Sequence, residues 1–202
     1  MNVELDIEKL IEKNFLESSY VEKSKYLEKE FLGYYDYLEI KESYFKKCDF
    51  FKGVFQGVDI EKVIFESCNL SNCKLINHSY NKILFKNCNL IGVNFVDSYL
   101  EDIIFDNCNL LYSNFSKANL KNVSFKNCNL EEASFNEVKW KKLEFIECNL
   151  SEAEFQKTLL KDLDITTCSI NNIGIDITKM KGLIISVEQS IFIASILGLK
   201  IK

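Results

Sequence analysis

An apolar side chain recurs at every fifth position from Ile40 to Ile185, without an interruption. This period matches neither the period of about 3.6 residues of a helix nor the period of about two residues of a strand. The chain must therefore turn once in every five residues and keep one side chain of each quintet inside. The first of these central residues are Phe45, Phe50, Phe55, Ile60, Phe65, Leu70 and Leu75.

A second period, of twenty residues, shows how many quintets complete one circuit. Cysteines recur at this spacing from Cys48 to Cys168, and phenylalanines from Phe45 to Phe145. Four quintets therefore make one coil, and coils stacked about 4.8 Å apart satisfy one another's backbone groups as paired strands do. We expect an all-β solenoid, a right-handed quadrilateral β-helix of about seven coils over residues 38–185.

Individual quintets also resemble a known family. Ser67 to Ser71 reads SCNLS and Lys117 to Lys121 reads KANLK. Both are similar to the A/C-[D/N]-[L/F]-x-x consensus of the pentapeptide repeat proteins, and the resemblance covers about three quarters of the chain. It implies the β-helix fold, but a fold by itself does not imply a function.

The segment before the repeats lacks the five-residue pattern, and we expect it to cap the first coil with helices. Asp6 is a suitable N-cap, and apolar residues follow it at helical spacing as far as Phe15. Ser19 and Glu22 match a capping box that opens a second helix. The sequence therefore predicts a helical hairpin as an N-terminal cap over residues 1–37.

The segment after the repeats, residues 186–202, is expected to hold one short helix opened by a capping box of Ser186 and Gln189. The helix is apolar on nearly every side, so one coil end cannot bury all of its side chains. The simplest cover is a second copy in a two-fold homodimer. The expected interface residues are Ile191, Phe192, Ile193, Ile196 and Leu197. The segment from Gly182 to Leu199 also resembles the C-terminal cap of Qnr-type quinolone-resistance proteins, and that resemblance implies dimerisation at this helix.

The cysteines and the single histidine do not form a reactive site in the sequence pattern. Zinc-binding cysteines usually come in C-x₂₋₄-C pairs, whereas these thiols form one inward column, where small buried residues are needed. His78 lies at an inward position, and no nucleophile or orienting partner for a catalytic base is evident near it. We therefore expect no enzyme activity, no metal and no cofactor.

The chain has no apolar run long enough to span a membrane, which takes about 18 residues. Its first residues also lack the basic and apolar regions of an export signal. We expect a cytoplasmic protein with no membrane partner, and its cysteines should be reduced there.

One outward column of the expected rod is apolar. Tyr44, Ile64, Leu84 and Ile104 occupy the same water-facing position in four successive coils, and Ser124 then replaces them. An apolar ladder of this length should be covered. We expect either the N-terminal helices or a partner protein to cover it.

Charge is unevenly placed along the chain. Residues 1–40 hold ten acids and five lysines, so the net charge of −5 lies there and the rest of the chain is balanced. Glu131, Glu132 and Glu152 nevertheless form a candidate acidic face, with a lysine column on the opposite side. The chain has no arginine and its aromatic residues point inward, so we expect no direct binding of nucleic acid.

Two functions remain open. The favoured one is a non-enzymatic scaffold that binds a protein partner not identified by the sequence. The alternative follows from the resemblance to Qnr-type proteins. It is a mimic of DNA that binds DNA gyrase or a related topoisomerase and changes quinolone sensitivity.

Overall fold

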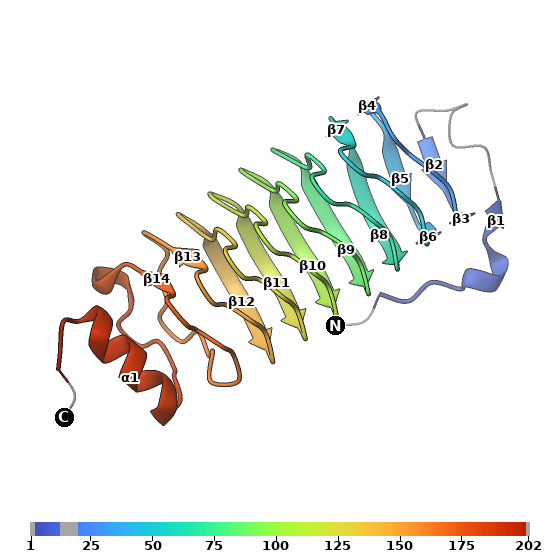
Figure 1. Cartoon of the computed structure of the whole chain (residues 1–202). Coiled ribbons are helices and arrows are strands. Elements are labelled where there is room, and N and C mark those ends of the chain that lie inside the picture. Colours follow the sequence, from blue (N-terminus) through green and yellow to red (C-terminus); the bar gives the residue numbers. More distant parts are fainter. Residues whose placement is uncertain (1–2, 13–19, 201–202) are drawn as a thin grey trace.

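The chain folds into a rod of stacked coils in which all strand pairs are parallel (Figure 1). The computed structural model describes residues 3–12 and 20–200, and the rod makes about eight turns. Its strands are β1 (Ile11–Glu12), β2 (Tyr20–Glu22), β3 (Ser24–Leu27), β4 (Tyr34–Asp36), β5 (Glu39–Lys41), β6 (Tyr44–Lys46), β7 (Val54–Gln56), β8 (Asp59–Glu66), β9 (Ser79–Lys86), β10 (Tyr99–Asp106), β11 (Asn119–Lys126), β12 (Lys139–Ile146), β13 (Glu154–Phe155) and β14 (Gly174–Ile175).

The largest sheet runs along most of the rod in the order β1-β3-β6-β8-β9-β10-β11-β12, with β2 and β5 alongside. Paired residues lie twenty positions apart, as Leu100 with Leu120 and Phe105 with Phe125. The twenty-residue period of the sequence is therefore the register of the sheet, and the predicted β-solenoid is confirmed.

Each eight-residue strand spans two faces of the rod and bends at one residue between them. In β9, β10 and β11 these residues are Lys82, Asp102 and Asn122, with φ of 53°, 57° and 55°. One residue in this left-handed region redirects the chain without breaking the strand ladder. Repetition of such a bend explains how the chain turns every five residues.

The interior is filled by stacks of aromatic rings that follow the coil spacing. Phe105 and Phe125 stack with ring centroids 4.7 Å apart and planes within 3°. The neighbouring stack on another face meets them edge to face, as Phe115 does with Phe125 at 5.6 Å and 83°. Offset and edge-to-face arrangements of this kind are favourable for aromatic pairs. The core is therefore continuous along the rod.

The expected N-terminal helical hairpin is wrong for the described residues, because Tyr20 to Asp36 already build a turn of the solenoid. Val21 pairs with Ile40 through β2 and β5. Tyr26 stacks on Phe45 with centroids 5.0 Å apart. The described segment therefore adds the extra turn beyond the seven expected. Phe15 and Ser19, on which the helical interpretation partly rested, lie outside the described residues.

A one-residue change of register hid this turn in the sequence. Val21 lies nineteen positions before its partner Ile40, not twenty. Tyr35, further along the same turn, is again twenty positions before Phe55. Counting back from Ile40 in steps of five therefore reaches Glu30, which faces solvent, and the repeat seems to end there.

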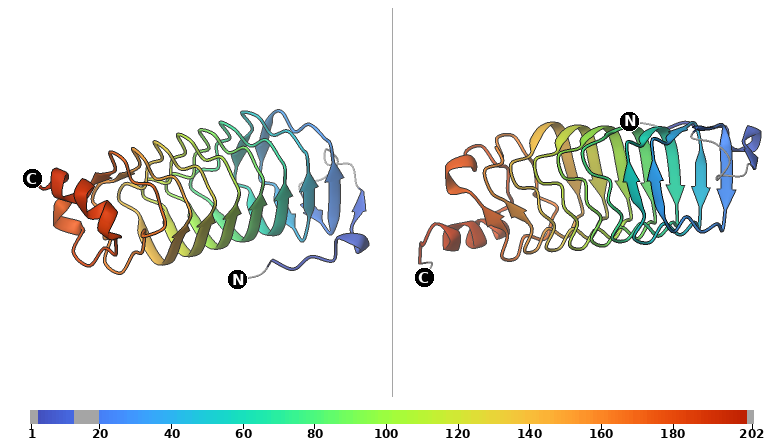
Figure 2. Two further views of the ribbon diagram at one scale, coloured as in Figure 1. Left: turned by 60° about the horizontal axis from the view of Figure 1, so that its bottom comes forward. Right: turned by 90° about the horizontal axis from the view of Figure 1, so that it is seen from above.

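The N-terminal segment, residues 3–12, begins beside the middle of the rod and runs along its outside to the N-terminal end, where β1 lies (Figures 1 and 2). We call it the N-terminal strap. It contains one turn of 3₁₀ helix, η1 (Ile7–Lys9), and then β1, which pairs with β3 and extends the sheet at this end. The strap thus follows an extended path where a helix was expected.

The C-terminal end of the rod is closed by α1 (Val187–Ile196), after a short 3₁₀ helix, η3 (Ile177–Lys179). The capping box of Ser186 and Gln189 is present, as predicted. Gln189 also donates hydrogen bonds to the carbonyl oxygens of Ile165 and Cys168, both at 2.7 Å, which fixes the helix on the last coil. No helix among the described residues is long and apolar enough to cross a membrane.

Candidate interaction surfaces

Helix α1 presents an exposed apolar surface at the C-terminal end of the rod. Its members, with exposed fractions, are Val187 (82%), Ile191 (57%), Phe192 (42%), Leu197 (44%) and Leu199 (61%). We call this surface the C-terminal patch. Five large apolar side chains on one short segment exceed the scattered exposure that is normal on a protein surface.

Of the residues predicted to form the dimer interface, the structure exposes some and buries others. Ile191, Phe192 and Leu197 belong to the C-terminal patch, whereas Ile193 is 6% exposed and Ile196 packs against the core. Ile193 and Ile196 therefore anchor the helix on the last coil and are not free to contact a partner. Val187 and Leu199 are exposed as well, and they flank the apolar run that predicted the interface.

The outward stripe of Tyr44, Ile64, Leu84 and Ile104 lies on β6, β8, β9 and β10. The strap covers much of it. A second apolar cluster joins Tyr44 and Ile64, both buried, with Leu84 and with strap residues Val3, Leu5, Ile7 and Leu10. Ile104 stays half-buried. The stripe thus packs against the N-terminal strap, which is extended where helices were expected.

A polar contact accompanies this apolar packing. The Tyr44 hydroxyl donates to Oε2 of Glu66 at 2.5 Å, and Lys46 forms an ion pair with the same carboxylate at 3.3 Å. Burial raises the pKa of Tyr44, and the carboxylate beside it raises the pKa further. The hydrogen bond from Tyr44 and the contact with Lys46 in turn lower the pKa of Glu66.

The candidate acidic face is brought together around one exposed tyrosine. Tyr112 is 54% exposed, and its pKa is raised by a hydrogen bond to Glu132 and by the charges of Glu131 and Glu152. Glu131 also accepts a hydrogen bond from the side-chain amide of Asn149 at 3.1 Å. The three glutamates therefore form a compact negative surface two coils long rather than a continuous acidic rod.

The cysteine column is buried and its thiols donate hydrogen bonds to backbone carbonyls. Cys108 donates to the carbonyl oxygen of Phe85 and Cys128 to that of Phe105, both at 3.4 Å. Burial raises the pKa of Cys73 and of Cys88 to about 12, so these thiols stay protonated and unreactive. Among the residues that the structure describes, no group of three or more His, Cys, Asp or Glu is placed to hold a metal.

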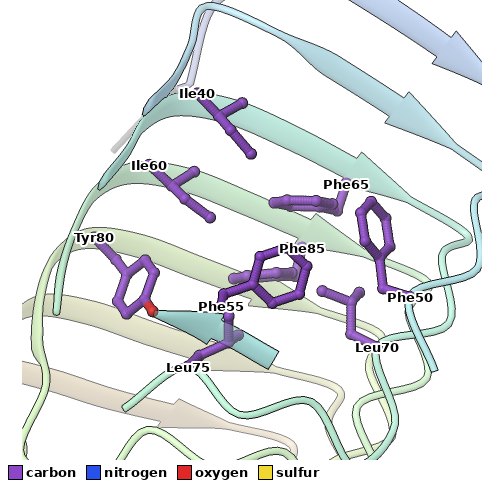
Figure 3. Close-up of a pocket in the computed structure, with 9 residues that line it drawn as sticks. All are labelled: Ile40, Phe50, Phe55, Ile60, Phe65, Leu70, Leu75, Tyr80 and Phe85. Carbon is purple, nitrogen blue, oxygen red and sulfur yellow. The ribbon is translucent and has the colours of Figure 1, made fainter. Parts of the chain in front are cut away.

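The interior offers almost no free space. A void of about 10 Å³, roughly the space of one water molecule, lies among apolar side chains (Figure 3). Tyr80 is 2% exposed, and its hydroxyl has no hydrogen-bond partner within the described chain. A void of this size, lined by Ile40, Phe50 and similar side chains, does not admit a substrate.

His78 is half-buried at the surface, and its ring takes part in the backbone hydrogen bonds between adjacent coils. Its Nε2 accepts a hydrogen bond from the backbone N–H of Gly57 at 2.8 Å. A surface pocket of about 290 Å³ opens beside it, lined by Lys74, Asn77 and neighbouring side chains. No hydroxyl or thiol nucleophile lines this pocket, so the residues of a nucleophilic catalyst do not meet here.

Parallel strands, four inward columns and filled coils define the class of protein: a β-solenoid built from five-residue repeats. The chain belongs to the pentapeptide repeat family, because the model of the pentapeptide repeat region matches residues 38–115, 58–133, 79–155 and 118–183. The resemblance found in the quintets is thereby confirmed. A search of curated proteins finds no match to the sequence.

Solved structures of pentapeptide repeat proteins resemble the chain at low identity. A trypsin-treated variant of QnrB1, a plasmid-mediated fluoroquinolone resistance protein, is 22% identical, with 95% of each chain covered and a TM-score of 0.46. Full-length QnrB1 is 19% identical, with 89% of this chain and 90% of that chain covered and a TM-score of 0.43. HetL from the cyanobacterium Nostoc, involved in regulation of heterocyst differentiation, is 12% identical, with 77% and 84% covered and a TM-score of 0.37.

Proposed function

We propose that the protein is a non-enzymatic scaffold that pairs with a second copy through the C-terminal patch and binds a partner protein on its faces. The observation that carries the proposal is the C-terminal patch itself. Val187 and Ile191 alone expose 82% and 57% of their surface, although α1 is firmly anchored by Ile193 and Gln189. An anchored helix that keeps large apolar side chains in water is typical of an interface.

The filled interior supports a binding role over a catalytic one. Enzyme sites are usually concave pockets in which several titratable groups converge. In the described part of this chain the thiols are buried, the Nε2 atom of His78 is engaged by the backbone, and the interior void has the size of a water molecule. Binding on the outer faces therefore fits the molecule better than chemistry inside it.

Light scattering tests the pairing of two copies. Phe192→Glu places a charge in the C-terminal patch and should convert a dimer into a monomer, because a buried unpaired charge costs several kcal/mol at an interface. Leu32→Glu is the matched control, since Leu32 is 56% exposed at the opposite end of the rod. A wild-type protein that is monomeric at all concentrations would overturn the proposed interface.

The acidic surface around Tyr112 favours a second candidate, a DNA mimic that acts on a topoisomerase. Three carboxylates on one edge resemble a short stretch of phosphates, although the lysines on the opposite face make the rod bipolar. Of the column Lys121, Lys141, Lys161 and Lys181, only Lys121 has an ion pair among the described residues, with Glu101. A supercoiling assay of DNA gyrase, with and without a fluoroquinolone, tests this candidate.

A mimic would change gyrase activity or drug sensitivity at micromolar protein, and Glu132→Lys with Glu152→Lys would abolish that change. The paired variant Glu28→Lys with Glu30→Lys, on the first turn, is the control for a general loss of negative charge. No effect of the wild-type protein at micromolar concentration would exclude the mimic and leave the scaffold.

A further inference from the structure

The pocket beside His78 arises where the backbone ladder of the rod is interrupted. Tyr37, Gly57 and Asn77 occupy the same corner in three successive coils. Tyr37 donates its N–H to the carbonyl oxygen of Gln56 at 3.0 Å, and Asn77 donates its N–H to the carbonyl oxygen of Val96 at 2.9 Å. Gly57, in the coil between them, donates its N–H instead to Nε2 of His78. One imidazole thus replaces one carbonyl of the ladder.

The size of His78 explains the interruption. The equivalent position is Val58 in the preceding coil and Ser98 in the next, and both are buried. An imidazole is too large for this corner of the core and turns outward, so His78 remains half-buried. A pocket of about 290 Å³ opens at the same place and reaches Val54, Lys74 and Ile76. This volume lies just below the range of about 300–1,000 Å³ that is usual for small-molecule sites.

The hydrogen bond also determines the tautomer of the ring. An Nε2 that accepts from a backbone N–H carries no proton, so the proton of neutral His78 is on Nδ1. No described residue accepts a hydrogen bond from Nδ1. Lys74, the one charged residue that lines the pocket, forms no ion pair within the described chain. The pocket therefore offers an ammonium group and a ring N–H, with no carboxylate to neutralise them.

The apolar part of the pocket lies next to these donors. Val54 is directly paired with Lys74 across adjacent coils, and Ile76 is 40% exposed on the same face. Gln56, which also lines the pocket, is held in place because its Oε1 accepts a hydrogen bond from the Tyr34 hydroxyl. A ligand that fits has one anionic head and a short hydrocarbon tail.

We infer that this pocket binds a small monocarboxylate with a short apolar tail. Lys74 and Nδ1–H of His78 hold the carboxylate, and Val54 and Ile76 contact the tail. Charge-assisted hydrogen bonds fix such a head group, while the tail adds affinity through burial. The site is independent of the C-terminal patch and of the acidic face, so it stands whether or not the proposed function holds.

Nuclear magnetic resonance of the histidine ring tests the inference directly. His78 is the single histidine of the chain, so its ring signals are assigned without ambiguity. Hexanoate is the probe, in a buffer of about pH 8 that keeps a free imidazole neutral. We expect a saturable shift of the ring signals in the millimolar range. Hexanol, which lacks the charge, and acetate, which lacks the tail, should each bind about tenfold more weakly.

Two lysine variants separate a real site from general attraction of anions. Lys74→Met keeps the length of the side chain and removes the charge, and should weaken hexanoate binding about tenfold. Lys117→Met, at a corner two coils away, should leave binding unchanged. A shift that grows without saturation, or equal binding by the wild type and Lys74→Met, would overturn the inference.

Calorimetry supplies a second readout without the histidine signal. His78→Val, with the residue found at this corner in the preceding coil, should restore a regular core and lose the heat of hexanoate binding. Circular dichroism confirms whether the variant keeps its fold. Full binding by a folded His78→Val protein would also overturn the inference.

Discussion

At the scale of single residues, the rod depends on side chains that tolerate an unusual backbone. Asn87, Asn107 and Asn127 occupy equivalent corners with φ of 54°, 52° and 51°. Asparagine is among the non-glycine residues most often found in this left-handed region. The side-chain amide of Asn107 also donates to the Oδ1 of Asn87 at 2.7 Å, so the corner column links adjacent coils.

Tyr80 gives a residue-scale prediction about stability. Its hydroxyl is buried without a partner within the described chain, whereas its two neighbours in the same column, Ile60 and Leu100, are aliphatic. Tyr80→Phe removes the buried polar atom and should raise the free energy of unfolding by about 1 kcal/mol. Urea denaturation measures the change.

The control for this substitution is Tyr44→Phe, which loses the hydrogen bond to Glu66 and should lower the free energy of unfolding. If Tyr80→Phe were destabilising instead, the Tyr80 hydroxyl must have a bound water or another partner in solution.

Glu66 gives a prediction of pH dependence. Its pKa is lowered by the hydrogen bond from Tyr44 and by Lys46, so the folded state favours the ionised carboxylate. The resulting stabilisation is complete above the unfolded pKa of about 4.3 and is lost as pH falls through the lower folded pKa. Unfolding of wild type and Glu66→Gln should therefore differ at neutral pH and converge in acid. A difference that stays constant down to strong acid would contradict this assignment.

At the scale of elements, the two ends of the rod are closed in different ways. The N-terminal end is extended by β1 and wrapped by the strap, whereas α1 covers the C-terminal end. Both solutions protect exposed strand edges, which otherwise pair with other chains. The helical end carries the C-terminal patch, whose apolar side chains are in contact with water.

Leu10 tests the strap. It is 7% exposed in the cluster with Tyr44 and Ile64. Leu10→Asp should detach the strap, lower the free energy of unfolding by about 1–3 kcal/mol and increase the fluorescence of a dye that binds apolar surface. Ile11→Asp is the matched control, because Ile11 is 63% exposed. Equal effects of both substitutions would mean that the strap does not shield the stripe.

The sequence predicted the elements with a strict period and failed where the period shifts. The inward columns, the twenty-residue register and the capping box of Ser186 were all evident, because each depends on spacing alone. The turn from Tyr20 to Asp36 was not, since Val21 and Tyr26 are one position out of register with Ile40. Here Ser19 and Glu22 fitted a helix start equally well, and tertiary stacking on the next coil decided the outcome.

The candidate surfaces were predictable to a similar extent. The apolarity of α1 was clear, but which of its side chains face the last coil depends on the angle at which the helix docks. Gln189, on the buried side of α1, ties the helix to the carbonyl oxygens of Ile165 and Cys168, and Ile193 is buried on that side while Val187 is exposed. The pocket beside His78 was not predictable, because it results from a side chain that does not fit its column.

At the scale of the whole molecule, the protein is a rod with distinct faces and with the C-terminal patch at one end. Eight coils at about 4.8 Å each give a rod about 38 Å long, before the strap and α1 are added. The acidic surface around Tyr112 lies on the side of the rod. The C-terminal patch lies at one end, where Figure 1 shows α1. Two copies joined at that patch would form a rod of about twice the length.

Small-angle X-ray scattering tests the proposed end-to-end pairing of two copies most directly. The account predicts that the wild-type protein has a maximum dimension about twice that of Phe192→Glu, because the C-terminal patch joins two rods end to end. Leu32→Glu should scatter like the wild type. Equal maximum dimensions for wild type and Phe192→Glu, with the mass of one chain in both, would contradict the account.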